Sequence, residues 1–108
     1  MTKLPGQPAR GTATGRPIMV LFDILGERWT LRILWELKSE PATLAELQNR
    51  CGAVSPTLMN RRLKSLREAK LIQHKKGEGY SLTPLACALS EHLRPLDQWS
   101  QKWARALD

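Results

Sequence analysis

Two helix-start signals, one shortly after the other, constrain the fold of this chain more than any other feature of its sequence. Thr43 stands three residues before Glu46, which is the spacing of a capping box, and Gly52 offers a left-handed position that ends the first helix. Ser55-Pro56 then starts a second helix, because Ser caps a helix well and Pro fits its first turn. The turn between the helices also contains an apolar residue, Val54. Two helices joined in this way predict a helix-turn-helix unit.

The rest of the chain is predicted to be mainly α-helical, with one small β-hairpin. Apolar residues recur at helical spacing in most segments, whereas a glycine-containing turn separates two short strand-like runs. In chain order, we expect helices at 17–25, 30–40, 44–51 and 56–69, strands at 71–75 and 80–82 joined by a turn at 76–79, and a last helix at 84–108 that Pro95 kinks.

Size and composition indicate a single globular domain. The chain has 108 residues, of which 42% are apolar and 25% charged, close to the average of globular proteins. No stretch is long and apolar enough to span a membrane, and residues 1–16 lack the apolar block of a secretory signal. Two cysteines, Cys51 and Cys87, are too few for a disulfide framework and lack the paired spacing of a zinc site. We therefore expect a cytoplasmic protein with no membrane partner.

The charge is strongly unbalanced, with a formal net charge of +7. Residues 60–79 contain seven basic and two acidic residues, and residues 1–16 contain three basic residues and no acid. A small protein with such clustered positive charge is predicted to bind a polyanion.

The helix that begins after Ser55 carries residue types suited to reading DNA bases. If Met59, Leu63 and Leu66 face the core, a turn of about 100° per residue directs a polar set outward. Arg pairs with guanine, Asn with adenine, and an apolar side chain meets the thymine methyl group. A solvated basic face is the plainer interpretation of the same pattern. The residues predicted to contact DNA from this helix are Ser55, Thr57, Leu58, Asn60, Arg61, Arg62 and Lys64.

The predicted hairpin strengthens the DNA-binding interpretation. It follows the second helix directly, where a winged helix has its wing, and its tip carries Lys75, Lys76 and Gly77. A basic tip of this kind can lie along the phosphates, where it adds affinity rather than sequence information.

Several short motifs occur in the order found in one known family. They are the run Gly26-Glu27-Arg28-Trp29-Thr30-Leu31, the run Val54-Ser55-Pro56, the run Arg62-Leu63-Lys64-Ser65-Leu66, the pair Leu71-Ile72, and the run Tyr80-Ser81-Leu82-Thr83-Pro84-Leu85. Over residues 17 to about 103 the chain resembles the HxlR family of bacterial and archaeal transcription regulators, which are winged-helix proteins similar to the MarR superfamily.

The resemblance implies a homodimer that binds a palindromic operator through the helix beginning at Ser55, with the first and last helices at the dimer interface. Three positions depart from the family pattern. Arg16 stands where many members have a cysteine that senses electrophiles or oxidants, so that mechanism is not carried over. Lys70 replaces the usual glycine, and the wing between Lys75 and Tyr80 is shorter than in most members.

A wide apolar stripe at the C-terminus also favours a dimer. Trp99 and Trp103 are four residues apart on one helix face, and a single short helix has too little core of its own to cover two indoles. A small-molecule pocket is the alternative role for these tryptophans. The residues predicted to form the dimer interface are Phe22, Leu25, Leu89, Leu93, Leu96, Trp99 and Trp103.

The remaining candidates give no catalytic chemistry. No nucleophile triad, phosphate-binding loop or dinucleotide-binding motif occurs, so we expect neither an enzyme nor a cofactor. His74 and His92 have no partner at metal-ligand spacing, and we expect no metal. Burial is the preferred interpretation of both cysteines, with redox sensing as the alternative.

The sequence therefore predicts a winged helix-turn-helix with N- and C-terminal dimerisation helices. Residues 1–16 are expected to form a flexible basic tail, residues 17–83 the DNA-binding domain and residues 84–108 the C-terminal dimerisation helix. The predicted function is a transcriptional regulator that binds double-stranded DNA sequence-specifically as a homodimer, with no effector identified. The alternative is a winged-helix protein-interaction or assembly module without sequence-specific DNA binding.

Overall fold

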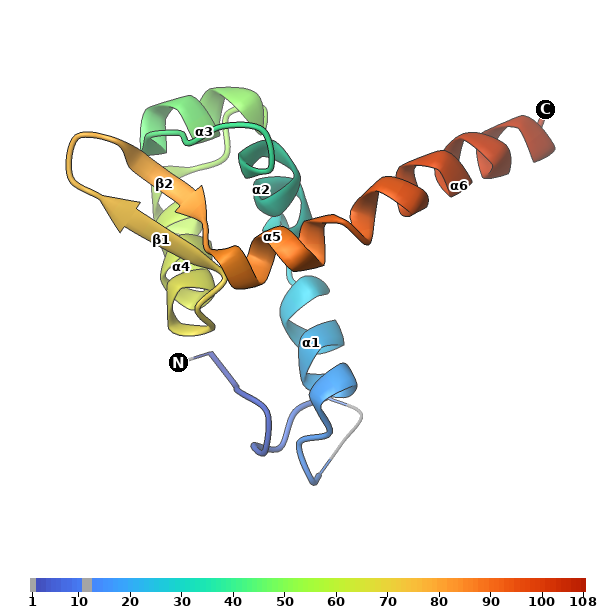
Figure 1. The fold of residues 1–108 in the computed structure, drawn as a ribbon, viewed down its shortest axis with the longest axis horizontal. Helices are drawn as coiled ribbons and strands as arrows, with labels where there is room; N and C mark the ends of the chain where they lie inside the picture. The colour runs from blue at the N-terminus through green and yellow to red at the C-terminus, as the bar shows by residue number, and fades with distance from the viewer. Residues whose placement is uncertain (1, 11–12) are drawn as a thin grey trace.

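The computed structural model describes residues 2–10 and 13–108. Its elements follow the predicted order, and Figure 1 shows the helices grouped beside one hairpin, with the last helix extending away from them. The elements are α1 (Pro17–Leu25), α2 (Thr30–Leu37), α3 (Leu44–Arg50), α4 (Pro56–Glu68), β1 (Ile72–Lys75), β2 (Gly79–Leu82), α5 (Pro84–Ser90) and α6 (Leu93–Ala106).

The helix-turn-helix unit forms as its capping signals predict. The Thr43 hydroxyl accepts the Glu46 backbone N–H at 3.2 Å, and the Glu46 carboxylate accepts the Thr43 backbone N–H at 3.1 Å, which completes the capping box at the start of α3. Gly52 ends α3 with a φ of 87°, in the left-handed region that glycine adopts at little cost. The Ser55 hydroxyl caps α4 by accepting the Leu58 N–H at 3.2 Å. These predicted caps are confirmed.

One apolar core holds α4 in place. Met59, Leu63 and Leu66, the predicted inner face of α4, are buried. They belong to a cluster that draws on α1 to α5, the hairpin and the turn before α4, and its other members are Val20, Ile24, Ile33, Leu34, Leu37, Ala42, Leu47, Cys51, Val54, Leu71, Ile72, Leu82 and Ala86. The helix-turn-helix therefore packs against the core with one face, and its other face is exposed to solvent.

The hairpin pairs antiparallel, and its second strand begins one residue earlier than predicted. The register runs from Ile72 opposite Leu82 to Lys75 opposite Gly79. Gly79 has a φ of 84°, and a Cβ atom built on it would lie 2.5 Å from the Ala42 carbonyl oxygen, so only glycine fits. This close approach arises because Ala42 and Tyr80 exchange backbone hydrogen bonds of 2.9 and 2.7 Å, which attach the segment before α3 to the hairpin.

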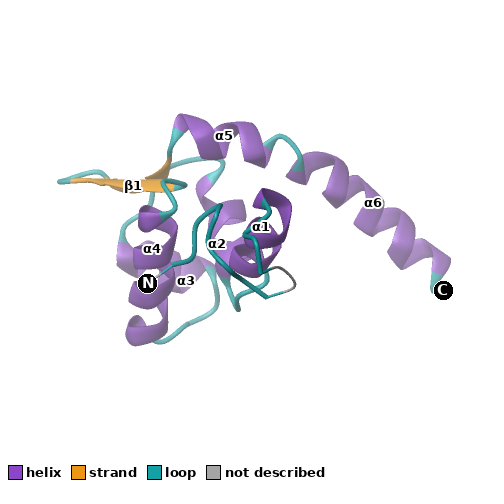
Figure 2. Cartoon of the chain, turned by 90° about the horizontal axis from the view of Figure 1, so that it is seen from below, coloured by secondary structure: helices purple, strands orange, loops and turns teal. Residues whose placement is uncertain are grey.

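The C-terminal region differs from the single kinked helix predicted for residues 84–108. It forms two helices, α5 and α6, with the break at residues 91–92 rather than at Pro95. Pro95 lies in the first turn of α6, where the N–H it lacks has no helical acceptor, so it is accommodated without a kink. Figures 1 and 2 show α6 projecting from the rest of the molecule.

The described part of the N-terminal segment lies against the domain. Arg10 forms an ion pair with Asp23 of α1, and the Thr2 backbone N–H donates to the Glu68 carboxylate at the end of α4 at 3.1 Å. Among the helices that the structure describes, none has both the length and the apolar character that crossing a membrane requires.

Candidate nucleic-acid interface

The outer face of α4 is polar, basic and accessible. Thr57, Asn60, Arg61 and Lys64 are exposed, and Leu58 is half-buried beside them. Within the described ranges, neither Arg61 nor Lys64 has an ion-pair partner or a side-chain hydrogen bond. Their charges are therefore free for a ligand, and the buried side of the same helix keeps this face turned outward.

Two residues predicted to contact DNA from α4 have structural roles in this chain. The Ser55 hydroxyl is used as the cap of α4. Arg62 is only 14% exposed, and its guanidinium donates to the Arg28 carbonyl at 2.7 Å and to the Glu27 carboxylate at 2.8 Å. The Arg62 side chain thus points inward although Arg61 points outward, because adjacent residues of a helix are rotated by about 100° about its axis.

The tip of the hairpin carries the predicted basic residues. Lys75, Lys76 and Gly77 are exposed, and Gly77 turns the chain with a φ of 83°. Figures 1 and 2 show the hairpin projecting beside α4, on which β1 packs. The ring centroids of His74 and Tyr80 lie 4.6 Å apart across the two strands, one pair before the pair that adjoins the turn.

Arg67 and Lys70 extend the basic surface beyond the residues that the sequence singled out. Both are exposed, Arg67 in the last turn of α4 and Lys70 just after it with a φ of 61°. The excess of basic residues over 60–79 is the signal that includes them. Positive side chains continue in this way from α4 towards the hairpin.

The residues predicted to form a dimer interface divide into two groups. Phe22, Leu96, Trp99 and Trp103 are 53–57% exposed, and the two indoles are stacked with ring centroids 6.2 Å apart. Leu93 is buried, and Leu25 and Leu89 are half-buried against the core, so in the single chain these three already have partners. Ile18 of α1 and Leu107, which directly follows α6, are also exposed, and neither was included in the predicted dimer interface.

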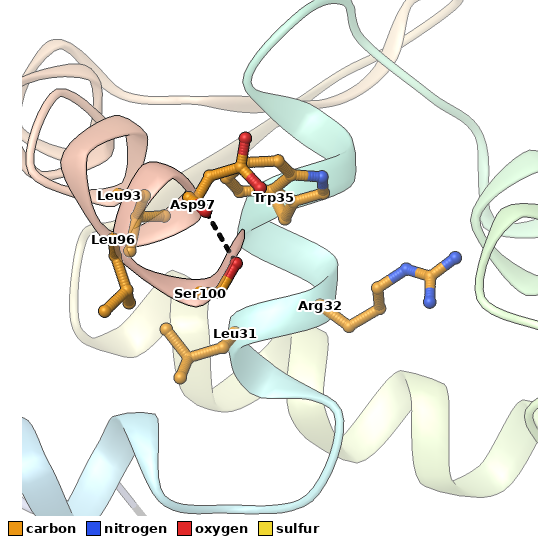
Figure 3. A pocket seen from close by; sticks show the side chains of 7 residues that line it. All are labelled: Leu31, Arg32, Trp35, Leu93, Leu96, Asp97 and Ser100. Atoms are coloured by element: carbon orange, nitrogen blue, oxygen red, sulfur yellow. Dashed lines mark hydrogen bonds between the residues drawn. The ribbon is translucent and has the colours of Figure 1, made fainter. Parts of the chain in front are cut away.

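A hollow of about 310 Å³ lies between α2 and α6. Figure 3 shows Trp35, Leu31, Leu93 and Leu96 around it, with the Ser100 hydroxyl donating to the Asp97 carbonyl at 2.6 Å. Neither Trp99 nor Trp103 lines this hollow. Trp99 and Trp103, for which a small-molecule pocket was the alternative role, therefore lie outside this hollow.

The two cysteines differ in exposure. Cys51 is buried as predicted, and burial raises the pKa of its thiol. Cys87 was also expected to be buried beside Leu85, and this is wrong: Cys87 is exposed, and so is Leu85, because α5 buries only Ala86. Over residues 2–10 and 13–108, no group of His, Cys, Asp or Glu is arranged to hold a metal ion.

A helix-turn-helix followed by a two-stranded hairpin, with a basic surface on its second helix, defines a winged-helix DNA-binding protein of the transcription-regulator type. The chain belongs to the HxlR-like helix-turn-helix family, which matches residues 24–108. A protein of Methanocaldococcus jannaschii described as an uncharacterized HTH-type transcriptional regulator is 31% identical over 93 residues, covering 82% of this chain and 86% of that protein.

Solved structures have the same fold. The crystal structure of quinone-bound YodB from Bacillus subtilis superposes with a TM-score of 0.72 at 24% identity, over 79% of this chain and 94% of that one. A protein from Enterococcus faecalis V583, assigned to the MarR family of transcriptional regulators, gives a TM-score of 0.69 at 21% identity over 92% and 96% of the two chains. These matches confirm the predicted winged-helix architecture.

Proposed function

We propose that this regulator binds a palindromic operator in double-stranded DNA as a homodimer and reads its sequence with α4. The observation that carries the proposal is the unpaired, exposed face of α4 over Thr57, Asn60, Arg61 and Lys64, backed by a buried apolar face. A helix with this division fits the major groove, where each base pair presents a distinct set of donors and acceptors.

The side chains on this face have separate roles in the proposal. Arg61 donates to guanine, Asn60 bonds adenine, and Leu58 with Thr57 contacts thymine methyl groups. Lys64, Lys75 and Lys76 meet phosphates, which adds affinity without sequence information. Ser55 contributes through the capped N-terminus of α4, where the helix dipole favours a phosphate.

The dimer brings two copies of α4 to one operator. The exposed side chains of Phe22 on α1 and of Leu96, Trp99 and Trp103 on α6 support association through these two helices. Two-fold symmetry would place the recognition helices about one DNA turn, ~34 Å, apart. In this proposal residues 17–83 bind DNA, residues 84–108 dimerise, residues 1–16 form a basic tail, and the protein works in the cytoplasm.

Selection from a library of random duplexes tests the proposal. The full chain is incubated with the library, bound duplexes are recovered and sequenced over several rounds, and one recurring inverted repeat is expected. A recovered pool without an enriched sequence would instead support the second candidate, an assembly module that uses the winged-helix scaffold without reading DNA.

A further inference from the structure

Arg62 joins two parts of the chain that are far apart in sequence. Its Nε donates to the Arg28 carbonyl at 2.7 Å, and its Nη1 donates to the Glu27 carboxylate at 2.8 Å. Glu27 is 35% exposed and Arg62 is 14% exposed, so solvent screens this contact less than the surface ion pairs elsewhere in the molecule. The contact ties the middle of α4 to the corner between α1 and α2.

The corner has two sterically restricted positions. Gly26 is tight against α1, since an added Cβ atom would lie 2.9 Å from the Phe22 carbonyl oxygen. Trp29 has a φ of 76°, a left-handed conformation that is rare for a bulky residue, and its side chain packs against the core. The Arg28 carbonyl that accepts from Arg62 immediately precedes this residue. Arg62 therefore bonds to the chain directly beside a residue, Trp29, that packs against the core.

Over residues 2–10 and 13–108, the other side-chain contacts that attach the middle of α4 to the body are apolar. Burial of Met59, Leu63 and Leu66 keeps the outer face of α4 turned outward, but apolar burial is less directional than a hydrogen bond. A guanidinium that donates to a carboxylate and to a carbonyl is directional and fixes the rotation of the helix about its axis. Arg61, the proposed base-reading residue, is the neighbour of Arg62, so the same rotation sets where Arg61 points.

We infer that Glu27 and Arg62 are a positioning pair that sets the orientation in which the outer face of α4 meets the operator. This inference rests on the proposed function, since it concerns the same recognition helix. Neither residue touches a base in this account, and both act on specificity through the rotation of α4.

Replacing Glu27 tests the inference, because the loss of its negative charge and the weakening of its bond to Arg62 should change the affinity for the operator in opposite directions. Removing an acid from a protein that binds a polyanion should tighten binding to every duplex, if charge alone acts. Weakening the bond between Arg62 and Glu27 should weaken binding to the operator alone. The substitution Glu27→Gln separates these effects, because it keeps the shape of the side chain and removes its charge.

The experiment measures the dissociation constants of the full-length Glu27→Gln variant for the library-selected operator and for a random duplex of equal length. We expect about tenfold weaker binding to the operator, within the range of couplings between contacting groups. Binding to the random duplex should stay unchanged or tighten. The control is Glu91→Gln, which removes an exposed acid at the end of α5 and should leave the ratio of the two constants as in the wild type.

A second variant keeps the net charge constant. Arg62→Lys retains the positive charge but cannot donate in two directions from a planar group, and it should lower operator affinity in the same way. Each variant is assayed at a temperature where its circular dichroism spectrum matches that of the wild type, so that unfolding does not contribute. A variant that stays unfolded at every temperature is set aside, and the other one decides.

The inference is overturned if Glu27→Gln and Arg62→Lys keep the wild-type ratio between operator and random duplex. It is also overturned if Glu27→Gln tightens binding to both duplexes equally. Failure of the proposed function looks different, because the wild-type protein would then select no operator and would show no ratio to lose.

Discussion

Arg61 and Arg62 are adjacent on α4, yet Arg61 is exposed, whereas Arg62 is only 14% exposed and bonds to Glu27. Both are arginines on α4, and both were assigned to DNA contact from the sequence. Helical spacing correctly predicted that Arg61 is exposed. It could not predict that Arg62 forms an ion pair with Glu27, which is 35 positions away in the sequence. A pairing over that distance depends on how the helices pack, and this information is absent from the local pattern.

Replacement of Arg61 tests base reading at the level of one side chain. Arg61→Ala should weaken binding to the operator by ~1–3 kcal/mol and relax the preference at one position in each half-site, because a bidentate contact to guanine is lost. Fluorescence anisotropy with the operator and its single-base variants measures this. The control is Arg105→Ala on α6, which removes the same charge away from α4; equal losses on operator and random DNA for Arg61→Ala would contradict base reading.

The cysteines provide a second residue-scale prediction. A thiol reagent should modify Cys87 in the native protein and leave Cys51 unmodified, since Cys51 is buried and its pKa is raised by burial. Mass spectrometry of the labelled chain identifies the modified position, and labelling in denaturant should reach both. Fast native labelling of Cys51 would show that the turn after α3 opens readily.

At the scale of elements, local sequence signals predicted where the helices start, but they did not predict contacts between segments that are distant in the sequence. Thr43 and Ser55 each cap a helix as predicted, because capping involves residues within one turn, and Thr83 caps α5 in the same way. The bonds between Ala42 and Tyr80, and the early start of β2 at Gly79, come from segments that meet only in the folded chain. The break between α5 and α6 was missed because Pro95 was expected to kink one long helix. A proline also fits the first turn of a new helix, which is where Pro95 lies.

The hairpin should act as a phosphate contact. Lys75→Ala combined with Lys76→Ala should weaken binding to operator and random DNA alike, and should reduce the salt dependence by ~1 unit of slope for each lost phosphate contact. Binding measured over a series of salt concentrations gives the slope. Lys102→Ala combined with Arg105→Ala on α6 is the matched control, because it also removes two positive charges. A slope that stays unchanged in the hairpin variant would mean that the wing does not touch the DNA backbone.

At the scale of the whole molecule, the fold class was predictable because the capped helices, the hairpin and the apolar stripes all favoured the same architecture. The projecting α6 could be expected only in part. Its stacked tryptophans are exposed in the single chain, whereas Leu93 of the same stripe is buried in it. Sequence spacing alone cannot separate side chains that fill the core of their own chain from those that stay exposed.

Dimerisation through α6 is the whole-molecule prediction. Trp99→Ala combined with Trp103→Ala should give a monomer in analytical ultracentrifugation and should weaken operator binding, because one half-site alone binds weakly. Leu85→Ala is the control, since it removes an exposed apolar side chain from α5 and should leave the dimer intact. A dimer that persists in the double variant and still binds tightly would place the interface elsewhere.

The central claim is that this HxlR-family protein recognises a particular DNA sequence. The most direct measurement is the ratio of its dissociation constants for a scrambled duplex and for the selected operator, of equal length and at physiological salt. Sequence reading by α4 predicts a ratio of at least ~10³. A ratio close to one, with both duplexes bound equally by charge alone, would contradict the account.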